Sequence, residues 1–283
     1  MAFRKQDWSV LALYALGFSR VRNALERFRK RPIVRFLAFH DLPESAIEAF
    51  KAKLKFLKEN TNVIDISDYF SCRLSVDRLN IVITFDDGYK SWRLHAAPAL
   101  RQLQLPATFF ISSGFLNLQG TELSDFTHLR LRIKNLTTGP LCDHDVRELA
   151  EMGFTIGGHT YHHVNLCEYT DESGVIDELA TDKGNLESLT GHKVNYFAYP
   201  FGAFQNSVIN LPALVARAGF GGAVTTISGV NDPAMNPFLL NRELTDASMP
   251  LTVFKARVFG NQDGVRLLKE IIAKRPRSKA RLP

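Results

Sequence analysis

The sequence predicts an α/β protein whose parallel sheet holds about eight strands, a number that permits closure into a barrel. Short apolar runs rich in β-branched and aromatic residues recur along the chain. Segments with a helical spacing of apolar residues separate these runs, and no internal repeat or long low-complexity stretch interrupts the alternation. Polar residues follow several of the predicted strands, at the sheet edge where ligands of α/β proteins bind.

Length and composition favour one main globular domain. The 283 residues can bury a sizeable core, and a single α/β barrel fits this length. A hydrophobic content of 45% and a charged content of 23% are ordinary, so neither a disordered chain nor an integral membrane protein is expected. Cys72, Cys142 and Cys167 are scattered and give no disulfide framework, so a reducing compartment is the simpler inference.

The net charge of +6 is partly concentrated at the two ends of the chain. This charge suits an anionic membrane surface or polymer better than nucleic acid, and no nucleic-acid partner is expected, although solvated termini explain the charge equally well. The basic clusters are Arg20, Arg22, Arg27, Arg29, Lys30 and Arg31 near the start, and Lys274, Arg275, Arg277, Lys279 and Arg281 at the end.

Residues 1–31 are expected to form a basic, helical segment before the main domain. The apolar stretch 10–18 is too short to span a bilayer, and no clear signal-peptide cleavage site follows it. We therefore expect a cytoplasmic or peripherally membrane-associated protein. An amphipathic helix over about 9–29, either docked on the protein or lying on a membrane, fits this segment.

The main domain is expected to span residues 32–274, followed by a basic tail at 275–283. Pro32 breaks the N-terminal helix, and residues 33–39 then form a buried strand that delivers His40 and Asp41 at its C-terminal end. An apolar stripe predicts a crossover helix over 44–60, and a short strand follows at 63–64.

The next strand ends in the most informative stretch of the chain. The apolar run 81–83 is typical of a strand buried on both faces, and Asp86 and Asp87 lie at its C-terminal end. Two neighbouring carboxylates cannot both be buried and ionised without a cation or a proton between them. The pair therefore indicates a metal, or one carboxylate that binds a metal while the other transfers protons. A solvated Asp-Asp-Gly turn is the alternative.

The middle of the chain continues the alternation of helices and strands. A helix is expected around 92–103 and a strand at 107–112. Residues 113–141 show little periodicity, and a stretch of that length is more often a functional lid or insertion than a structureless connector. A helix over 143–152 follows, and Gly153 ends it.

A strand at 154–156 leads into the second informative stretch, which contains His159 and His163. The intervening Gly157-Gly158 pair permits a sharp turn, and the four-residue spacing puts both imidazoles on one side of a helical turn, where they can bind one divalent ion. One carboxylate and two imidazoles leave positions open for water and a substrate oxygen, as in a catalytic metal site. Structural or surface histidines are the alternative.

The rest of the chain contains further strands and the closing helices. Pro200 stops one of these strands. The expected helices span 171–189, 207–218 and part of 251–274, and the expected strands span 195–199, 222–226 and 238–241.

Three stretches carry a resemblance to a known family. They are Thr84-Phe85-Asp86-Asp87-Gly88-Tyr89, His159-Thr160-Tyr161-His162-His163 and Phe197-Ala198-Tyr199-Pro200-Phe201-Gly202. In this order they resemble the first three motifs of the polysaccharide deacetylases of carbohydrate esterase family 4, the NodB-homology group. The resemblance covers about residues 33–245.

This resemblance implies a distorted (β/α) barrel of the NodB-homology type with about seven or eight strands. It also implies one divalent metal, most commonly zinc with cobalt, nickel or manganese as alternatives, and hydrolysis of N-acetyl groups on amino sugars of a glycan. Carried over by residue, the metal ligands are Asp87, His159 and His163, and Asp86 is the general base.

The resemblance further implies a substrate groove lined by Pro200 and Phe201, with the Phe201 backbone N–H helping to bind the oxyanion. Tyr89 and Tyr161 lie beside the motifs and are candidates to line the same groove, with packing inside the protein as the alternative. His162 is expected to point away from its two histidine neighbours.

The sequence departs from the commonest family pattern at two places, so other residues have to take over the roles of the missing arginine and the missing acid. Ala198 stands where many members have an arginine, and Arg242 is a candidate substitute to orient Asp86, with a surface ion pair as the alternative. No Leu-x-His acid motif occurs near the C-terminus. His40 is a candidate for the acid, as in a permuted subgroup resembling the biofilm exopolysaccharide deacetylases, because it ends a strand as Asp86 does. A core histidine is the alternative.

The chemistry agrees with these assignments. Amide hydrolysis needs a polarised carbonyl, a base for the attacking water and an acid for the leaving amine. The sequence therefore predicts a metal-dependent N-deacetylase acting on a glycan with N-acetylated amino sugars, such as an exopolysaccharide. A hydrolase of another bond, such as an N-formyl group or a lipid-linked sugar, and a catalytically silent carbohydrate-binding member are the alternatives.

Overall fold

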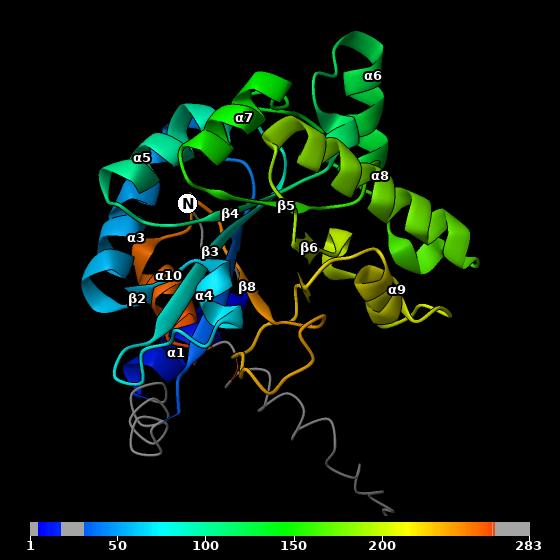
Figure 1. Cartoon of the computed structure of the whole chain (residues 1–283). Coiled ribbons are helices and arrows are strands. Elements are labelled where there is room, and N and C mark those ends of the chain that lie inside the picture. The colour runs from blue at the N-terminus through cyan, green and yellow to red at the C-terminus, as the bar shows by residue number, and fades with distance from the viewer. Residues whose placement is uncertain (1–4, 18–30, 262, 264–283) are drawn as a thin grey trace, which may run out of the picture.

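The fold is a nearly closed barrel of parallel strands surrounded by helices, and it confirms the predicted fold class (Figure 1). The computed structural model describes residues 5–17, 31–261 and 263. Seven strands in this part of the chain are hydrogen-bonded in the order β7-β6-β5-β4-β3-β1-β8, and an eighth, β2, pairs with β3 alone. The strands are β1 (Val34–Phe39), β2 (Asn62–Val63), β3 (Asn80–Asp87), β4 (Thr108–Ile111), β5 (Thr155–Gly158), β6 (Tyr196–Ala198), β7 (Gly222–Val224) and β8 (Arg242–Leu244).

The helices lie outside the barrel, mostly in the positions that the apolar stripes predict. None of those in the described residues is long and apolar enough to cross a bilayer. The α-helices are α1 (Lys5–Ala15), α3 (Ile47–Asn60), α4 (Ile66–Phe70), α5 (Ala97–Gln102), α6 (Gly120–Asp125), α7 (Asp143–Glu151), α8 (Glu172–Thr190), α9 (Leu211–Arg217) and α10 (Leu251–Val258).

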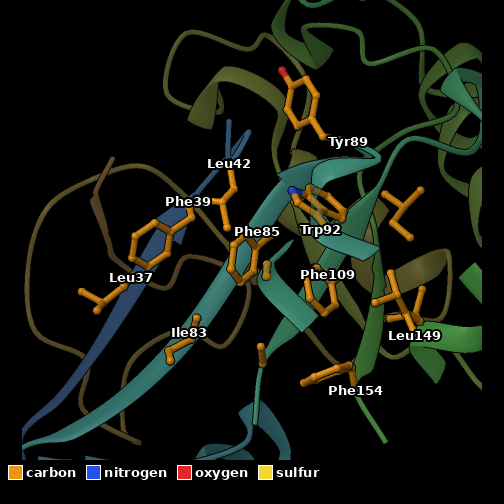
Figure 2. Close-up of a cluster of buried hydrophobic side chains, with 14 of the residues drawn as sticks. Leu37, Phe39, Leu42, Ile83, Phe85, Tyr89, Trp92, Phe109, Leu149 and Phe154 are labelled. Atoms are coloured by element: carbon orange, nitrogen blue, oxygen red, sulfur yellow. The ribbon is translucent and has the colours of Figure 1, made fainter. Parts of the chain in front are cut away.

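Alternate side chains of the strands pack into two separate cores. Phe36 of β1, Val82 of β3 and Phe110 of β4 fill the barrel interior. Their sequence neighbours point outward into the layer between the barrel and the helices. Figure 2 shows this outer layer, in which Phe85 stacks on Phe109 with 4.9 Å between ring centroids and Trp92 lies 5.2 Å from the same ring. The rigid double core fixes where each strand ends.

The register between β1 and β3 brings two predicted site residues to the same edge. The two strands pair in parallel from Val34 opposite Asn80 to Phe39 opposite Phe85. His40 and Asp86 are the next residues of the two strands, so both emerge at the C-terminal end of the barrel.

The last predicted strand, 238–241, is wrong. Leu240 makes only a single bridge to Val224 of β7, and β8 begins at Arg242. The side chain of Asn231 binds the main chain of Asn241 instead, since its Oδ1 accepts from the Asn241 N–H at 2.7 Å and its Nδ2 donates to the Asn241 carbonyl at 2.8 Å. These side-chain bonds replace ladder bonds of a strand at Asn241. The main chain of this segment is joined to β7 by the bridge at Leu240 and by the Ala223 N–H, which donates to the Pro237 carbonyl at 2.8 Å.

The predicted sharp turn at Gly157-Gly158 is also wrong. Both glycines lie inside β5. A Cβ atom on Gly157 would lie 2.4 Å from the Phe110 ring, and one on Gly158 would lie 3.0 Å from a carboxylate oxygen of Asp182. The strand has glycine at these two positions because Phe110 and Asp182 approach its backbone closely.

One predicted helix is shorter than expected, and one short helix was missed. The helix expected over 207–218 begins only at Leu211, because Asn210 caps it by accepting from the Ala213 N–H at 3.3 Å. The short helix α4 was not predicted. Its first turn is stabilised by a capping box between Asp65 and Asp68.

The described part of the N-terminal segment docks on the protein. Helix α1 packs against α10, where Arg257 donates to the Asp7 carboxylate at 3.0 Å and Val10 is fully buried. Residues 18–30 and 264–283, which hold most of the two basic clusters and the end of the closing helical region, lie outside the described residues. The domain boundaries and the contact with a membrane therefore stay predictions.

Candidate active site

A cavity of about 580 Å³ opens at the C-terminal end of the barrel. Its walls contain seven of the ten predicted site residues, which are His40, Asp86, Asp87, Tyr89, His159, His163 and Phe201. Ligands of parallel α/β proteins bind at this end, because the loops that leave the strands converge there. The cavity is therefore the candidate active site.

Asp86 is bound by a buried arginine. The two guanidinium Nη atoms of Arg242 donate to the two carboxylate oxygens of Asp86, each at 2.6 Å. Both side chains are almost fully buried. Burial raises the pKa of Asp86, but the charge and hydrogen bonds of Arg242 together with the nearby histidines outweigh that effect, so the pKa lies below its ordinary value. Asp86 is therefore ionised at neutral pH.

The arginine reaches Asp86 across the barrel interior from β8. Its Nε donates to the Thr225 carbonyl at 2.7 Å and one Nη donates to the Thr84 hydroxyl at 3.1 Å, so its position is fixed by three partners. Ala198 of β6, the position at which the resemblance leads one to expect an arginine, is a small buried side chain of the same interior. The alternative of a surface ion pair for Arg242 is wrong, because its side chain is completely buried.

Asp87, His159 and His163 form a second, separate cluster. The Asp87 Oδ1 lies 3.4 Å from the His159 Nε2 and 3.2 Å from the His163 Nε2. All three side chains are buried. Burial raises the pKa of Asp87, but hydrogen bonds with both histidines hold it well below its ordinary value. Burial lowers the pKa of His163, and the interaction with Asp87 more than reverses this.

Main-chain carbonyls orient both imidazoles. The Nδ1 of His159 lies 2.7 Å from the Ala198 carbonyl, and the Nδ1 of His163 lies 3.0 Å from the Arg130 carbonyl. A carbonyl oxygen can only accept, so each Nδ1 carries a proton and each Nε2 faces Asp87, where it would give up its own proton to bind an ion.

The two histidines do not lie on a helical turn, contrary to the sequence prediction. The segment after β5 is an irregular loop, in which Thr160 and His163 have left-handed backbone angles with φ of 61° and 51°. Asp87 itself has φ of 95°. Such angles are strained for residues other than glycine. They turn the side chains of Asp87, His159 and His163 toward one point. The imidazoles converge because of this loop conformation.

The cluster fits a divalent metal ion. A tetrahedral ion with bonds of about 2.0–2.2 Å separates its ligand atoms by roughly 3.3–3.6 Å, close to the spacing between Asp87 and the two imidazoles. One carboxylate oxygen and two Nε2 atoms form a donor set suited to zinc and neighbouring transition metals. Asp87, His159 and His163 could therefore hold such an ion with further positions open to the cavity.

His40 and Asp41 follow β1 and lie in different surroundings. His40 is exposed on the cavity wall, so the alternative of a core histidine is wrong. The Asp41 carboxylate accepts from the hydroxyl of Ser91 at 2.6 Å and from the hydroxyl of Thr137. Asp41 therefore joins the strand end to the segment after α6.

The unperiodic stretch 113–141 forms a wall of the cavity. It contains α6 and a π-helical turn, Phe126–Arg130, and it is attached to the barrel end by the Leu141 N–H, which donates to the Gly88 carbonyl at 2.9 Å. Leu131, Ile133, Asn135 and Thr137 of this stretch line the cavity. The prediction of an insertion with its own structure is confirmed, and the bonds to Gly88 and Asp41 hold it in place as a wall.

Phe201 lies at the edge of the cavity between two side chains. Its ring centroid is 4.8 Å from that of His163 and 4.4 Å from the guanidinium carbon of Arg132. The Phe201 backbone has φ of 58°. This strained turn after β6 presents the aromatic ring beside the candidate metal cluster.

Two predicted groove residues are not brought to the cavity, and a third is mostly covered. Pro200 is buried and Tyr161 packs on His162, with 4.3 Å between ring centroids. Tyr89 contributes to the cavity wall but is almost fully buried against Trp92 and Phe115. In Figure 2 the Tyr89 hydroxyl points away from Trp92. Burial raises the pKa of Tyr89, with the Asp87 charge acting in the same direction, so the hydroxyl stays protonated.

Some residues at the site were missed from the sequence. Asp246 and Ser248, in the loop after β8, also line the cavity. Glu178 and Asp182 of α8 contact the histidine loop. The sequence does contain a signal for Glu178 and Asp182. Both fall on the apolar stripe of α8, where a buried carboxylate needs a specific partner.

The chain belongs to the polysaccharide deacetylase family. The family model described as Polysaccharide deacetylase matches residues 75–219, just over half of the chain. The matched range includes Asp86, Asp87, His159 and His163. His40 and Arg242 lie outside it.

Similar proteins agree with this fold. YxkH of Bacillus subtilis (strain 168) is 23% identical over 213 residues, which cover 74% of this chain and 68% of that protein. The structure of IcaB from Ammonifex degensii has a TM-score of 0.63 and 22% identity, and covers 81% of this chain and 97% of IcaB. The BpsB deacetylase domain from Bordetella bronchiseptica has a TM-score of 0.60 and 19% identity, and covers 76% and 96%. Such similarity establishes the common barrel.

The cluster of Asp87, His159 and His163 predicts a specific metal stoichiometry. We expect about one zinc ion per chain, and His159→Ala or His163→Ala should weaken zinc binding by more than about 100-fold, because two ligands seldom hold a catalytic ion tightly. Zinc titration against a chromogenic chelator measures this. His192→Ala, which removes an exposed histidine outside the cluster, is the matched control. A ligand variant with the affinity of the control would remove that residue from the site.

The buried pair of Arg242 and Asp86 predicts a stability effect. Arg242→Met should destabilise the protein by about 3–5 kcal/mol, because it leaves an unpaired carboxylate in the barrel. The double variant with Asp86→Asn should recover much of this loss, since it also removes the buried charge. Urea unfolding of the wild type, both single variants and the double variant measures the coupling. Additive losses would show that the two side chains do not interact.

Proposed function

We propose that the protein is a divalent-metal-dependent deacetylase that removes N-acetyl groups from the amino sugars of a glycan. The observation that carries the proposal is the separation of two adjacent carboxylates into two environments. Asp87 faces two imidazoles, and Asp86 is held by Arg242. Membership of the polysaccharide deacetylase family supports the reaction class.

The metal site would supply the electrophilic part of the reaction. Asp87, His159 and His163 would hold a divalent ion, which would supply polarisation of an amide carbonyl and a lowered pKa of water. The main chain at Phe201, at the edge of the same cavity, is our candidate for donating a hydrogen bond to the carbonyl oxygen as it gains negative charge.

Asp86 is our candidate for the general base. Its carboxylate is ionised, it lines the cavity, and it is the sequence neighbour of the candidate ligand Asp87. It would take the proton of the water that attacks the carbonyl carbon. Arg242 is the positioning residue, because its two hydrogen bonds fix both carboxylate oxygens.

His40 is our candidate for the general acid. Its imidazole is exposed in the cavity at the end of β1, next in register to Asp86. When the bond between the carbonyl carbon and nitrogen breaks, acetate leaves and the sugar nitrogen needs a proton. Imidazolium is the side chain whose ordinary pKa best suits this donation near neutrality.

Release of acetate tests this function directly. The zinc-loaded protein should release acetate from oligosaccharides of N-acetylated amino sugars, and a chelator should abolish the release. Matched N-formylated sugars test whether the protein prefers another acyl group, and a lipid-linked N-acetyl sugar tests whether it prefers a lipid-linked substrate. If the loaded protein releases acid from none of these substrates, it is not a deacylase of amino sugars.

The acid role of His40 predicts a substrate-dependent loss. His40→Ala should keep its zinc but lose on the order of 10²–10⁴-fold in turnover of the N-acetyl substrate. The loss should be much smaller with an activated phenyl acetate, whose leaving group needs no proton. His192→Ala is again the surface control. Equal losses on both substrates would exclude proton donation to the amine as the task of His40.

A further inference from the structure

We propose that Asp182 and Glu178 of α8 are positioning residues that fix the candidate metal ligand His159 and its loop before any ion binds. This inference rests on the proposed function, because it assigns these carboxylates a task toward the proposed metal site. Neither residue belongs to the three sequence motifs, and neither lines the cavity.

Asp182 ties two strand ends to the helix. Its side chain is completely buried. One carboxylate oxygen accepts from the His159 N–H at 2.7 Å, and the other accepts from the Ser113 N–H at 2.7 Å. Within the described residues Asp182 has no ion-pair partner, and burial raises its pKa to about 7 although these two main-chain donors oppose the rise. The hydrogen bonds join the ends of β4 and β5 through one side chain.

Glu178 lies one helical turn before Asp182, on the same face of α8. Its two carboxylate oxygens lie 2.9 Å from the His162 N–H, which donates, and 2.7 Å from the His162 Nδ1. Its own carbonyl accepts from the Tyr161 N–H at 3.3 Å. His162 thus points away from the cavity, as expected, and it attaches the middle of the loop to α8.

Contacts around His159 leave its backbone little freedom. The His159 N–H is bound by Asp182, and its carbonyl accepts from the Ser112 hydroxyl at 2.9 Å. Gly158 lets the carboxylate come this close, since a Cβ at that position would lie 3.0 Å from it. The His159 ring is held at Nδ1 by Ala198. Main chain and ring are therefore both fixed, and the Nε2 is placed without help from a metal.

A positioning role and a purely structural role predict different results. A purely structural contact contributes to the stability of the fold, and its loss leaves the metal affinity of the folded protein unchanged. A positioning contact holds the loop in the ligand geometry before the ion binds. Without that contact the ion has to order the loop as it binds, and this cost lowers the affinity for the metal. The affinity of the folded protein for zinc alone therefore separates the two roles.

The test is zinc affinity, measured by chelator competition on folded protein. Asp182→Asn keeps the size of the side chain, but its amide can accept from only one of the two main-chain N–H groups and directs its own NH₂ at the other. We expect the zinc affinity to fall by about 10–100-fold. Glu178→Gln should weaken zinc binding in the same direction, and it serves as the test variant if Asp182→Asn does not fold.

Two control variants on the same helix complete the experiment. Leu186→Ala truncates a fully buried side chain and should lower the melting temperature without changing zinc affinity. Asp177→Asn removes an exposed carboxylate and should change neither. If the wild type binds zinc and Asp182→Asn binds it equally well, the inference is wrong. A loss of affinity in Leu186→Ala as large as in Asp182→Asn would also overturn it. If the wild type binds no zinc, the proposed function itself fails.

Discussion

Two adjacent carboxylates are buried at the end of β3, and the rest of the site compensates their charge. Two ionised groups cannot share a buried position without cations or hydrogen-bond donors. The strand solves this by separating them. Asp86 points into the barrel, where Arg242 binds both oxygens, and Asp87 turns through a strained backbone toward two imidazoles. The strand β8 carries the arginine that binds Asp86, and the loop after β5 carries the two imidazoles that face Asp87. Both elements therefore supply the partners that the two buried carboxylates require.

The sequence predicted the barrel well where packing decides the structure. Buried runs such as that before Asp86 gave the strands, and apolar stripes gave most helices. The errors lie where side chains bind the main chain. Asn231 satisfies the backbone of Asn241 and displaces β8 by a few residues, and Asp182 explains a glycine that looked like a turn residue. Such bonds join positions far apart in the sequence, so no local pattern contains them.

At the site, the sequence indicated which residues meet but not how they meet. The spacing of His159 and His163 predicted a common ligand pair, yet a left-handed loop and not a helix brings the rings together. The missing arginine at Ala198 directed attention to Arg242, and the structure brings its guanidinium to Asp86. The carboxylates of α8 escaped notice because a helix with acidic residues usually exposes them to solvent.

The separate roles of Asp86 and Asp87 are tested most directly by a crystal structure of the zinc-loaded protein with anomalous diffraction at the zinc edge. We predict one anomalous peak about 2.0–2.2 Å from an Asp87 oxygen and from the Nε2 atoms of His159 and His163, with Asp86 still bound to Arg242. A peak that bridges Asp86 and Asp87, or that lies away from the two imidazoles, would contradict this separation of roles.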